Sequence, residues 1–84
     1  MRRSNERQPT YVDYETTGSR VRQLRKEHGM SQRHLADLLE VSQNAVSDIE
    51  KGKTRLSLDQ AYCLRERFKV DLDWLCPKKI GVID

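Results

Sequence analysis

Apolar residues recur at helical spacing in two neighbouring segments near the middle of the chain, residues 32–39 and 43–51. Each segment gathers its aliphatic side chains on one side and its polar side chains on the other, as helices do that are half-buried in a small core. The apolar positions are Leu35, Ala36, Leu38 and Leu39 in the first segment, and Ala45, Val46 and Ile49 in the second. The pattern therefore predicts two short helices, one after the other.

Short polar residues mark the limits of these two helices. Ser31 and Ser42 each stand immediately before one segment, where a serine side chain can accept a hydrogen bond from an unpaired backbone N–H of the first turn. Only Glu40 and Val41 separate the helices, which leaves room for a tight corner between packed helices. Gly52 stands at the predicted end of the second helix, where the left-handed conformation suits glycine. The chain is therefore organised around a helix, a corner and a second helix.

Three further helices are predicted on either side of this unit. The first runs from an N-cap at Ser19 to about His28, with Val21 and Leu24 facing inward and Gly29 ending it. The other two span residues 58–68 and 72–75, with N-caps at Ser57 and Asp71 and a stop at Pro77. The positions that follow the helical period in the longer one are Leu58, Ala61, Leu64, Arg65 and Phe68, with Tyr62 alongside. We therefore expect an all-α fold of five helices, with the folded domain over residues 18–76.

The two ends of the chain have a different composition from the middle. Residues 1–17 are basic and polar and are predicted to form an N-terminal arm. The arm either contacts phosphates, or is a frayed terminus, or packs on its own domain. Residues 77–84 form a tail with β-branched Ile80, Val82 and Ile83, typical of a strand. A lone strand is not stable, so the tail is expected to pair either with residues 10–14 or with the same tail of a second subunit.

Composition and charge narrow the class of protein. The chain has 84 residues, enough for one domain, and a formal net charge of +3 that mildly favours a polyanionic partner. Cys63 and Cys76 are too few for a disulfide framework and stand at no metal-ligand spacing from His28 or His34. We expect no catalytic residues, no metal and no cofactor. No apolar run is long enough to span a membrane and no secretion signal follows Met1, so a cytoplasmic protein is expected.

The helix predicted over residues 43–51 carries short polar side chains on the face away from its apolar stripe. They are Gln43, Asn44, Ser47 and Asp48. Amide and hydroxyl groups near a helix N-terminus suit the base edges of a DNA major groove, and the alternative is an ordinary solvated face. Past Gly52, the loop of Lys53, Thr54 and Arg55, with Lys51 before it, offers donors to phosphate oxygens, and the alternative is a solvated charged turn.

The same residues give the chain a family resemblance over about residues 18–75. The matching words are Val21 to Gln32, then Leu35-Ala36, Val41-Ser42, and Val46 to Gly52, and together they resemble the Cro and lambda-repressor-like helix-turn-helix family, also called Xre-type regulators. The resemblance implies a five-helix domain in which the second and third helices read DNA. It also implies homodimers on operators of two-fold symmetry, in a bacterial or phage-encoded protein that joins the nucleoid when bound.

Individual roles follow from the resemblance position by position. Gln43, Asn44 and Ser47 correspond to base-contacting residues, and Arg25 and Glu50 correspond to an internal ion pair. Asp48 departs from the family pattern: its carboxylate would either accept from cytosine N4 or repel the DNA backbone. Gln32 corresponds to a glutamine that meets a phosphate at a helix N-terminus, where free N–H groups attract anions. The full set of expected phosphate contacts is Gln32, Arg33, Ser42, Lys53, Thr54 and Arg55.

The function expected from the sequence is binding of double-stranded DNA at specific sites, which would regulate transcription, most simply by repression. The alternative is a protein-interaction module on the same fold, such as an antitoxin that neutralises a partner. Such a module usually offers a large apolar patch or a tail that a partner orders, and residues 80–83 are the one candidate in the sequence.

Overall fold

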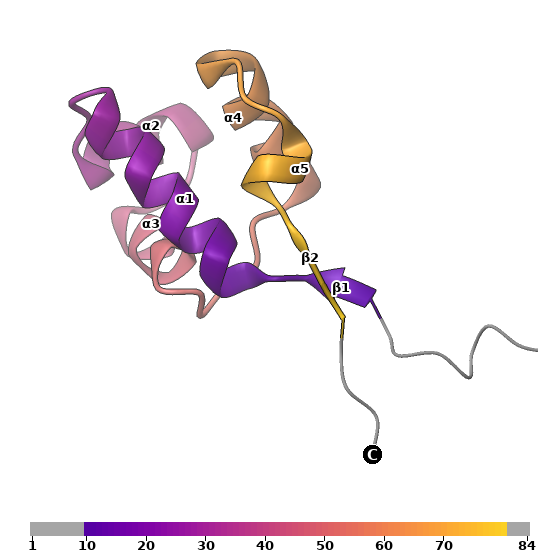
Figure 1. Cartoon of the computed structure of the whole chain (residues 1–84). Helices are drawn as coiled ribbons and strands as arrows, with labels where there is room; N and C mark the ends of the chain where they lie inside the picture. The colour runs from indigo at the N-terminus through magenta and orange to yellow at the C-terminus, as the bar shows by residue number, and fades with distance from the viewer. Residues whose placement is uncertain (1–9, 81–84) are drawn as a thin grey trace, which may run out of the picture.

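The computed structural model describes residues 10–80, in which five helices and two short strands follow one another (Figure 1). In chain order they are β1 (Thr10–Val12), α1 (Tyr14–Glu27), α2 (Gln32–Leu39), α3 (Gln43–Glu50), α4 (Leu58–Phe68), α5 (Leu72–Leu75) and β2 (Lys78–Ile80). The expected all-α architecture of five helices is confirmed, with a small strand pair added where the chain enters α1 and leaves α5.

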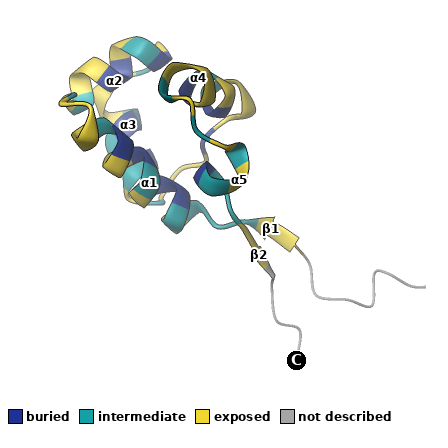
Figure 2. Ribbon diagram, turned by 45° about the horizontal axis from the view of Figure 1, so that its top comes forward, coloured by how far each residue is buried: buried dark blue, intermediate teal, exposed yellow. Residues whose placement is uncertain are grey.

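Aliphatic side chains from all five helices meet in one core. The ribbon in Figure 2 marks the buried residues of these helices in dark blue. Those with less than 2% of their surface exposed include Leu35 of α2, Leu64 of α4 and Leu75 of α5, with Val21 and Val46 from α1 and α3. Helix α3 packs against both α1 and α2. Because α2 and α3 each bury one narrow stripe, their other faces are left to solvent.

Helix α1 begins five residues before its expected N-cap. Asp13, not Ser19, is the N-cap residue, and Ser19 lies exposed inside the helix. The Asp13 side chain accepts hydrogen bonds from the backbone N–H of Thr16 at 3.2 Å and from its hydroxyl at 2.8 Å. These bonds to the Thr16 hydroxyl and N–H hold the pKa of the Asp13 carboxyl below its usual value. The expected arm of residues 1–17 therefore overlaps β1 and the first turn of α1; residues 1–9 lie outside the described part.

The C-terminal tail enters a strand pair with the segment before α1. Strands β1 and β2 run antiparallel, with Thr10 opposite Ile80 and Val12 opposite Lys78. The backbone N–H of Asp13 extends the ladder by donating to the Pro77 carbonyl at 2.9 Å. Of the two pairings expected for the tail, the structure has the one within the chain; residues 81–84 lie outside the described part.

Two details of the C-terminal half differ from expectation. Leu58, one of the positions on the helical period, leaves 66% of its surface exposed. It is the first residue of α4, which begins with a reciprocal capping box between Ser57 and Gln60. Asp71 stands at the N-cap of α5 but its side chain makes no capping bond. Within residues 10–80, no helix is long and apolar enough to cross a bilayer.

Candidate nucleic-acid interface

Two serine caps fix the helix–corner–helix unit formed by α2 and α3. The Ser31 hydroxyl accepts from the His34 N–H at 3.0 Å, and the Ser42 hydroxyl accepts from the Ala45 N–H at 3.1 Å. The corner itself turns at Glu40, whose backbone is left-handed with a φ of 59°. The Val41 N–H closes the end of α2 by donating to the Ala36 carbonyl at 3.0 Å. These bonds set the angle between the two helices by local geometry.

Helix α3 buries one face and exposes the residues of the opposite face to solvent. Val46 and Ile49 expose no more than 3% of their surface, and they pack the helix against α1 and α2. Gln43 and Asn44, in its first turn, are exposed, and Ser47 one turn later is half-buried. Within residues 10–80, neither the Gln43 nor the Asn44 amide enters a side-chain hydrogen bond. The helix therefore presents uncommitted amide groups from a fixed backbone.

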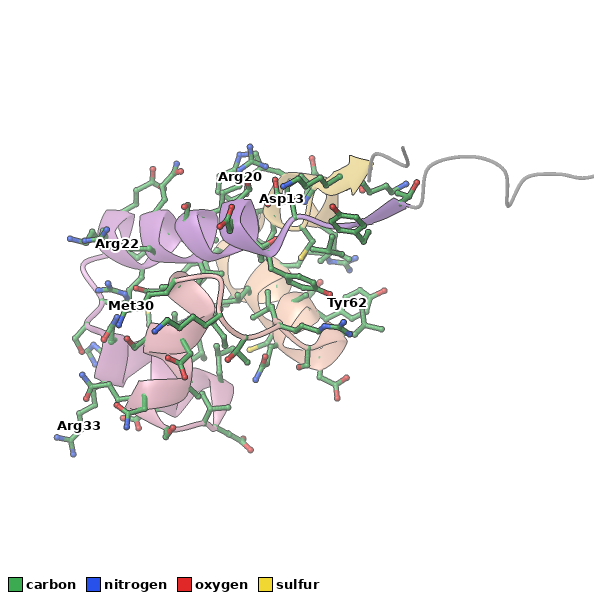
Figure 3. All side chains as sticks on the ribbon, turned by 90° about the horizontal axis from the view of Figure 1, so that it is seen from below. Asp13, Arg20, Arg22, Met30, Arg33 and Tyr62 are labelled. Atoms are coloured by element: carbon green, nitrogen blue, oxygen red, sulfur yellow. The ribbon has the colours of Figure 1, made fainter. Side chains whose placement is uncertain are left out.

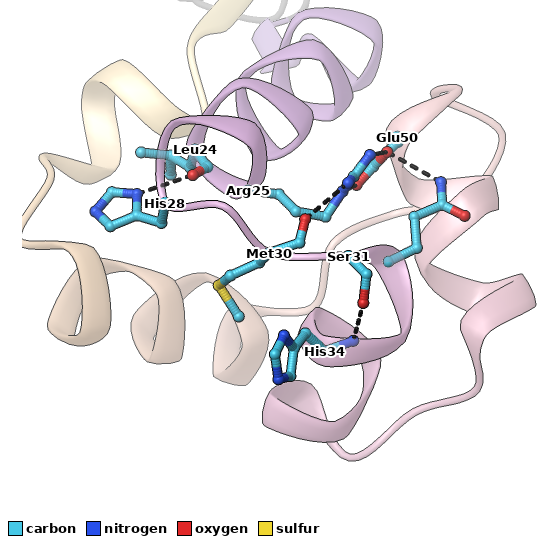
Figure 4. A network of polar contacts seen from close by, with 8 residues as sticks. Leu24, Arg25, His28, Met30, Ser31, His34 and Glu50 are labelled. Carbon is cyan, nitrogen blue, oxygen red and sulfur yellow. Dashed lines mark hydrogen bonds and ion pairs between the residues drawn. The ribbon is translucent and has the colours of Figure 1, made fainter.

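The expected ion pair between α1 and α3 is present (Figure 4). Arg25 donates through Nε to Glu50 Oε2 at 2.7 Å and through Nη2 to Oε1 at 3.1 Å. Its third bond goes from Nη1 to the Met30 carbonyl at 2.9 Å. The two side chains expose only 11% and 4% of their surface, and the hydrogen bond to Glu50 raises the pKa of the Arg25 guanidinium. One residue thus ties together α1, the turn before α2 and the end of α3.

The side chain of Gln32 also bonds to this ion pair, a contact that was not predicted from the sequence. Its amide Nε2 donates to Glu50 Oε1 at 3.1 Å, so the side chain is oriented by the ion pair. This bond uses one hydrogen of the Gln32 side-chain amide, so the amide oxygen Oε1 and the second N–H of Nε2 can still form hydrogen bonds. Because Gln32 is the first residue of α2, its backbone N–H belongs to the unpaired, positive end of that helix.

The loop after α3 is shaped by its glycine and exposes its cations. Gly52 has a φ of 76°, and the following N–H of Lys53 donates back to the Asp48 carbonyl at 2.9 Å. Lys53, Thr54 and Arg55 are all exposed. The Arg55 guanidinium lies 5.6 Å from the ring centre of Tyr14, a contact that the sequence did not predict and that holds the loop near the start of α1.

The histidine and cysteine side chains outside this site could in principle act as catalytic groups or metal ligands, but their contacts are those of structural residues. His28 bonds the Leu24 carbonyl through Nδ1 at 2.9 Å and lies 4.5 Å from the Phe68 ring, while Cys63 and Cys76 are free thiols. Among the described residues, no three His, Cys, Asp or Glu side chains gather as metal ligands would. Of the residues expected at the site, Gln32 and Ser47 line one hollow beside α3, and the loop after α3 is joined to that helix by the bond from the Lys53 N–H to the Asp48 carbonyl.

Comparison with known proteins gives a consistent result. A family model described as "Helix-turn-helix" matches residues 21–75. A putative HTH-type transcriptional regulatory protein of Pyrococcus furiosus is 43% identical over 51 residues, which cover 61% of this chain and 16% of that protein. The HTH-type transcriptional regulator RamB of Mycobacterium tuberculosis is 44% identical over 62 residues, covering 74% of this chain and 12% of RamB. The chain thus spans less than a fifth of the length of these relatives.

Solved structures of similar shape cover most of the chain. The restriction-modification controller protein C.AhdI of Aeromonas hydrophila aligns with a TM-score of 0.65 and 30% identity, over 75% of this chain and 96% of its own. The biofilm regulator SinR, solved in complex with DNA, aligns with a TM-score of 0.60 and 30% identity, over 70% of this chain and 95% of its own.

Proposed function

Because this chain belongs to the Cro and lambda-repressor-like helix-turn-helix family, we propose that it binds double-stranded DNA at specific sites and regulates transcription by occupying them. The observation that carries the proposal is the set of uncommitted polar side chains in the first turns of a helix whose opposite face is buried. Because its backbone is already fixed, such a helix can enter a major groove without a further cost for ordering the main chain, and only its side chains are ordered on binding. Repression is the simplest outcome, since a bound protein excludes polymerase from the same DNA.

Sequence would be read by Gln43, Asn44 and Ser47. An amide side chain can pair with adenine through N6 and N7 in the major groove, which gives Gln43 and Asn44 a chemical preference. Ser47 lies one turn after Gln43, so a small side chain there lets the helix approach the base edges closely. Asp48 is half-buried, and its backbone carbonyl accepts from Lys53. Its carboxylate would disfavour a nearby phosphate and favour cytosine N4.

Affinity would come from contacts to the DNA backbone on either side of α3. The N-terminus of α2 offers unpaired N–H groups, and the loop after α3 offers two exposed cations. The residues assigned to phosphates are Gln32, Arg33, Ser42, Lys53, Thr54 and Arg55. Each neutralised phosphate releases about 0.9 counterion from B-form DNA, so the affinity should fall steeply with salt.

A homodimer on a two-fold symmetric operator fits the size of this domain. One short reading helix covers too few base pairs to select a site in a genome, so two copies are needed for specificity. The surface that we propose for pairing is α5 with Trp74 and the C-terminal tail. Trp74 is half-buried, and the Arg20 guanidinium lies 5.1 Å from the centre of its ring.

A protein partner is the second candidate, favoured by one observation. Tyr11, Leu58 and Tyr62 expose 48%, 66% and 42% of their surface and come from β1 and one face of α4. In an antitoxin-like module, such side chains would lie at the contact with the partner.

Selection of bound duplexes from a random pool tests the proposed function. A recovered site with two-fold symmetry would support DNA reading by a dimer, and an asymmetric site would support reading by a monomer. A pool that stays random after several rounds at physiological salt would contradict sequence-specific binding and leave the partner-binding candidate in its place.

A further inference from the structure

A polar hollow of about 310 Å³ lies beside the proposed reading face. Side chains from three helices line it: Arg22 and Arg25 from α1, Gln32 from α2, and Ser47, Glu50 and Lys51 at the end of α3. Two of these residues, Ser47 and Gln32, are the ones assigned to a base and to a phosphate. The hollow therefore lies between the proposed reading helix and helix α1.

The charges around this hollow do not balance. Arg25 and Glu50 neutralise one another in the buried ion pair, and Gln32 and Ser47 are neutral. The two cations that remain, Arg22 and Lys51, are exposed, and neither forms an ion pair with a carboxylate of the described residues. Two uncompensated positive charges in the same lining as hydroxyl and amide groups make the hollow attractive to an oxygen-rich anion.

We propose that this hollow receives a backbone phosphate of the bound duplex, with Arg22 and Lys51 as its cationic contacts. This assignment rests on the proposed function and extends it to helix α1, which carries none of the phosphate contacts expected from sequence. Arg22 supplies a guanidinium that can hold two phosphate oxygens, and Lys51 supplies a compact ammonium from the end of α3.

The position of Arg22 fits a continuous track of backbone contacts. In Figure 3, Arg22 on α1 and Arg33 on α2 both lie toward the end of the molecule away from the strand pair. The hollow joins Arg22 to the N-terminal residue of α2 and to the last turn of α3. A strand that passes the N-terminus of α2 beside α3 would thus reach Arg22 next. A free phosphate ion would gain the same two cations but none of the neighbouring contacts.

The test compares Arg22→Gln and Lys51→Gln with Arg67→Gln, which removes the same charge from an exposed residue of α4, outside this hollow. Affinity is measured by fluorescence anisotropy for the selected duplex and a scrambled one, over a range of salt. Arg22→Gln and Lys51→Gln should each weaken binding to both duplexes about 3-fold to 10-fold and lower the salt slope by about 0.9. Arg67→Gln should change either affinity less than about twofold.

Folding and the source of the phosphate are checked separately. Melting temperatures of the three variants should match the unsubstituted protein, and Arg22→Lys should restore part of the lost affinity. NMR of the Arg22 side chain should respond to duplex at micromolar concentration but not to inorganic phosphate.

Each contrary result has a distinct meaning. If Arg22→Gln binds as the unsubstituted protein does, or no worse than Arg67→Gln, the assignment of the hollow is wrong while DNA binding stands. A saturating response to inorganic phosphate alone, with unchanged DNA affinity, would make it a free-anion site and would also overturn the assignment. If the unsubstituted protein binds no duplex, the proposed function fails first.

Discussion

Gly18 of α1 lies against the backbone of α3 at Ile49. A β-carbon at Gly18 would be in steric overlap with the Ile49 carbonyl oxygen and 2.8 Å from that of Glu50, far inside ordinary van der Waals contact. The absence of a side chain at Gly18 therefore sets how closely α1 approaches the end of α3. The same approach lets Arg25, farther along α1, reach Glu50.

Gly18→Ala should destabilise the protein although alanine is the better helix former. Intrinsic propensity alone would stabilise α1 by about 1 kcal/mol. Overlap with two carbonyl oxygens should outweigh this and lower the free energy of unfolding by about 2 kcal/mol in urea titrations. The matched control is Gly29→Ala, where no atom lies within 4 Å but φ is +65°, so the cost should be about 1 kcal/mol. A stabilised Gly18→Ala protein would show that α1 can move away from α3 freely.

Glu50→Gln should cost more than an exposed ion pair would. Both partners are nearly buried, so the substitution leaves the Arg25 charge without a carboxylate, and breaking such a pair costs about 3 kcal/mol. Urea denaturation measures this loss. The control is Glu66→Gln, which breaks the exposed pair with Arg65 and should change stability by less than about 1 kcal/mol. Equal effects in the two variants would mean that the buried pair adds nothing beyond a surface contact.

Asp13→Ala should lower the melting temperature at neutral pH and much less in acid. The pKa of the Asp13 carboxyl is lowered in the folded protein, so its stabilising effect is complete above the ordinary value of 3.8. That effect is lost as the pH falls through the lowered value, because the protonated carboxyl caps the helix poorly. Thermal melts of both proteins from about pH 7 to about pH 2 should converge at the acid end. A constant difference across this range would exclude the carboxylate as the cause.

Gln43→Ala and Asn44→Ala should relax sequence preference without affecting the fold. Each should reduce the ratio of specific to scrambled affinity by about 5-fold to 150-fold, the equivalent of about 1–3 kcal/mol for a bidentate base contact. Lys53→Ala is the comparison, since a lost phosphate contact should weaken binding to both duplexes alike. Anisotropy titrations at one fixed salt concentration separate the two behaviours. Unchanged ratios for the Gln43 and Asn44 variants would mean that other residues read the bases.

Leu58→Ala and Leu64→Ala test the orientation of α4. Leu64 is fully buried, and its truncation should cost about 3 kcal/mol or more. Leu58 is 66% exposed, so the same substitution should change the free energy of unfolding by less than about 0.5 kcal/mol. Chemical denaturation at low protein concentration makes the comparison. A large cost at Leu58 that grows with protein concentration would indicate that this side chain is covered by another copy.

The sequence predicted best where local chemistry decides the backbone. Serine caps and aliphatic periodicity placed α2 and α4 at their observed limits, and α3 within one residue of its end. Gly52 has the positive φ expected of a glycine that ends a helix. The Arg25–Glu50 pair was predicted through family resemblance and is confirmed. The contacts of the proposed DNA site remain predictions, because they depend on a partner molecule.

The start of α1 was missed because its local signals oppose a helix. Thr16, Thr17, Gly18 and Ser19 all have poor helix propensity, so Ser19 offered the better N-cap. The helix forms there because Asp13 caps it, Pro77 accepts from the Asp13 N–H, and Gly18 packs on α3. The left-handed backbone conformations of Glu40 and Lys69 were not predicted from the sequence either, since neither residue is a glycine.

The sequence by itself determined the helices α2 to α5, the serines that cap α2, α3 and α4, and the polar side chains that line α3, because these depend on contacts between near neighbours in the chain. Only the tertiary structure decided the early start of α1, the pairing of β1 with β2, the Gln32–Glu50 bond and the position of Arg22 beside Ser47 and Lys51. Each of these joins residues far apart in sequence, and no local preference encodes a contact that exists only after the helices have packed.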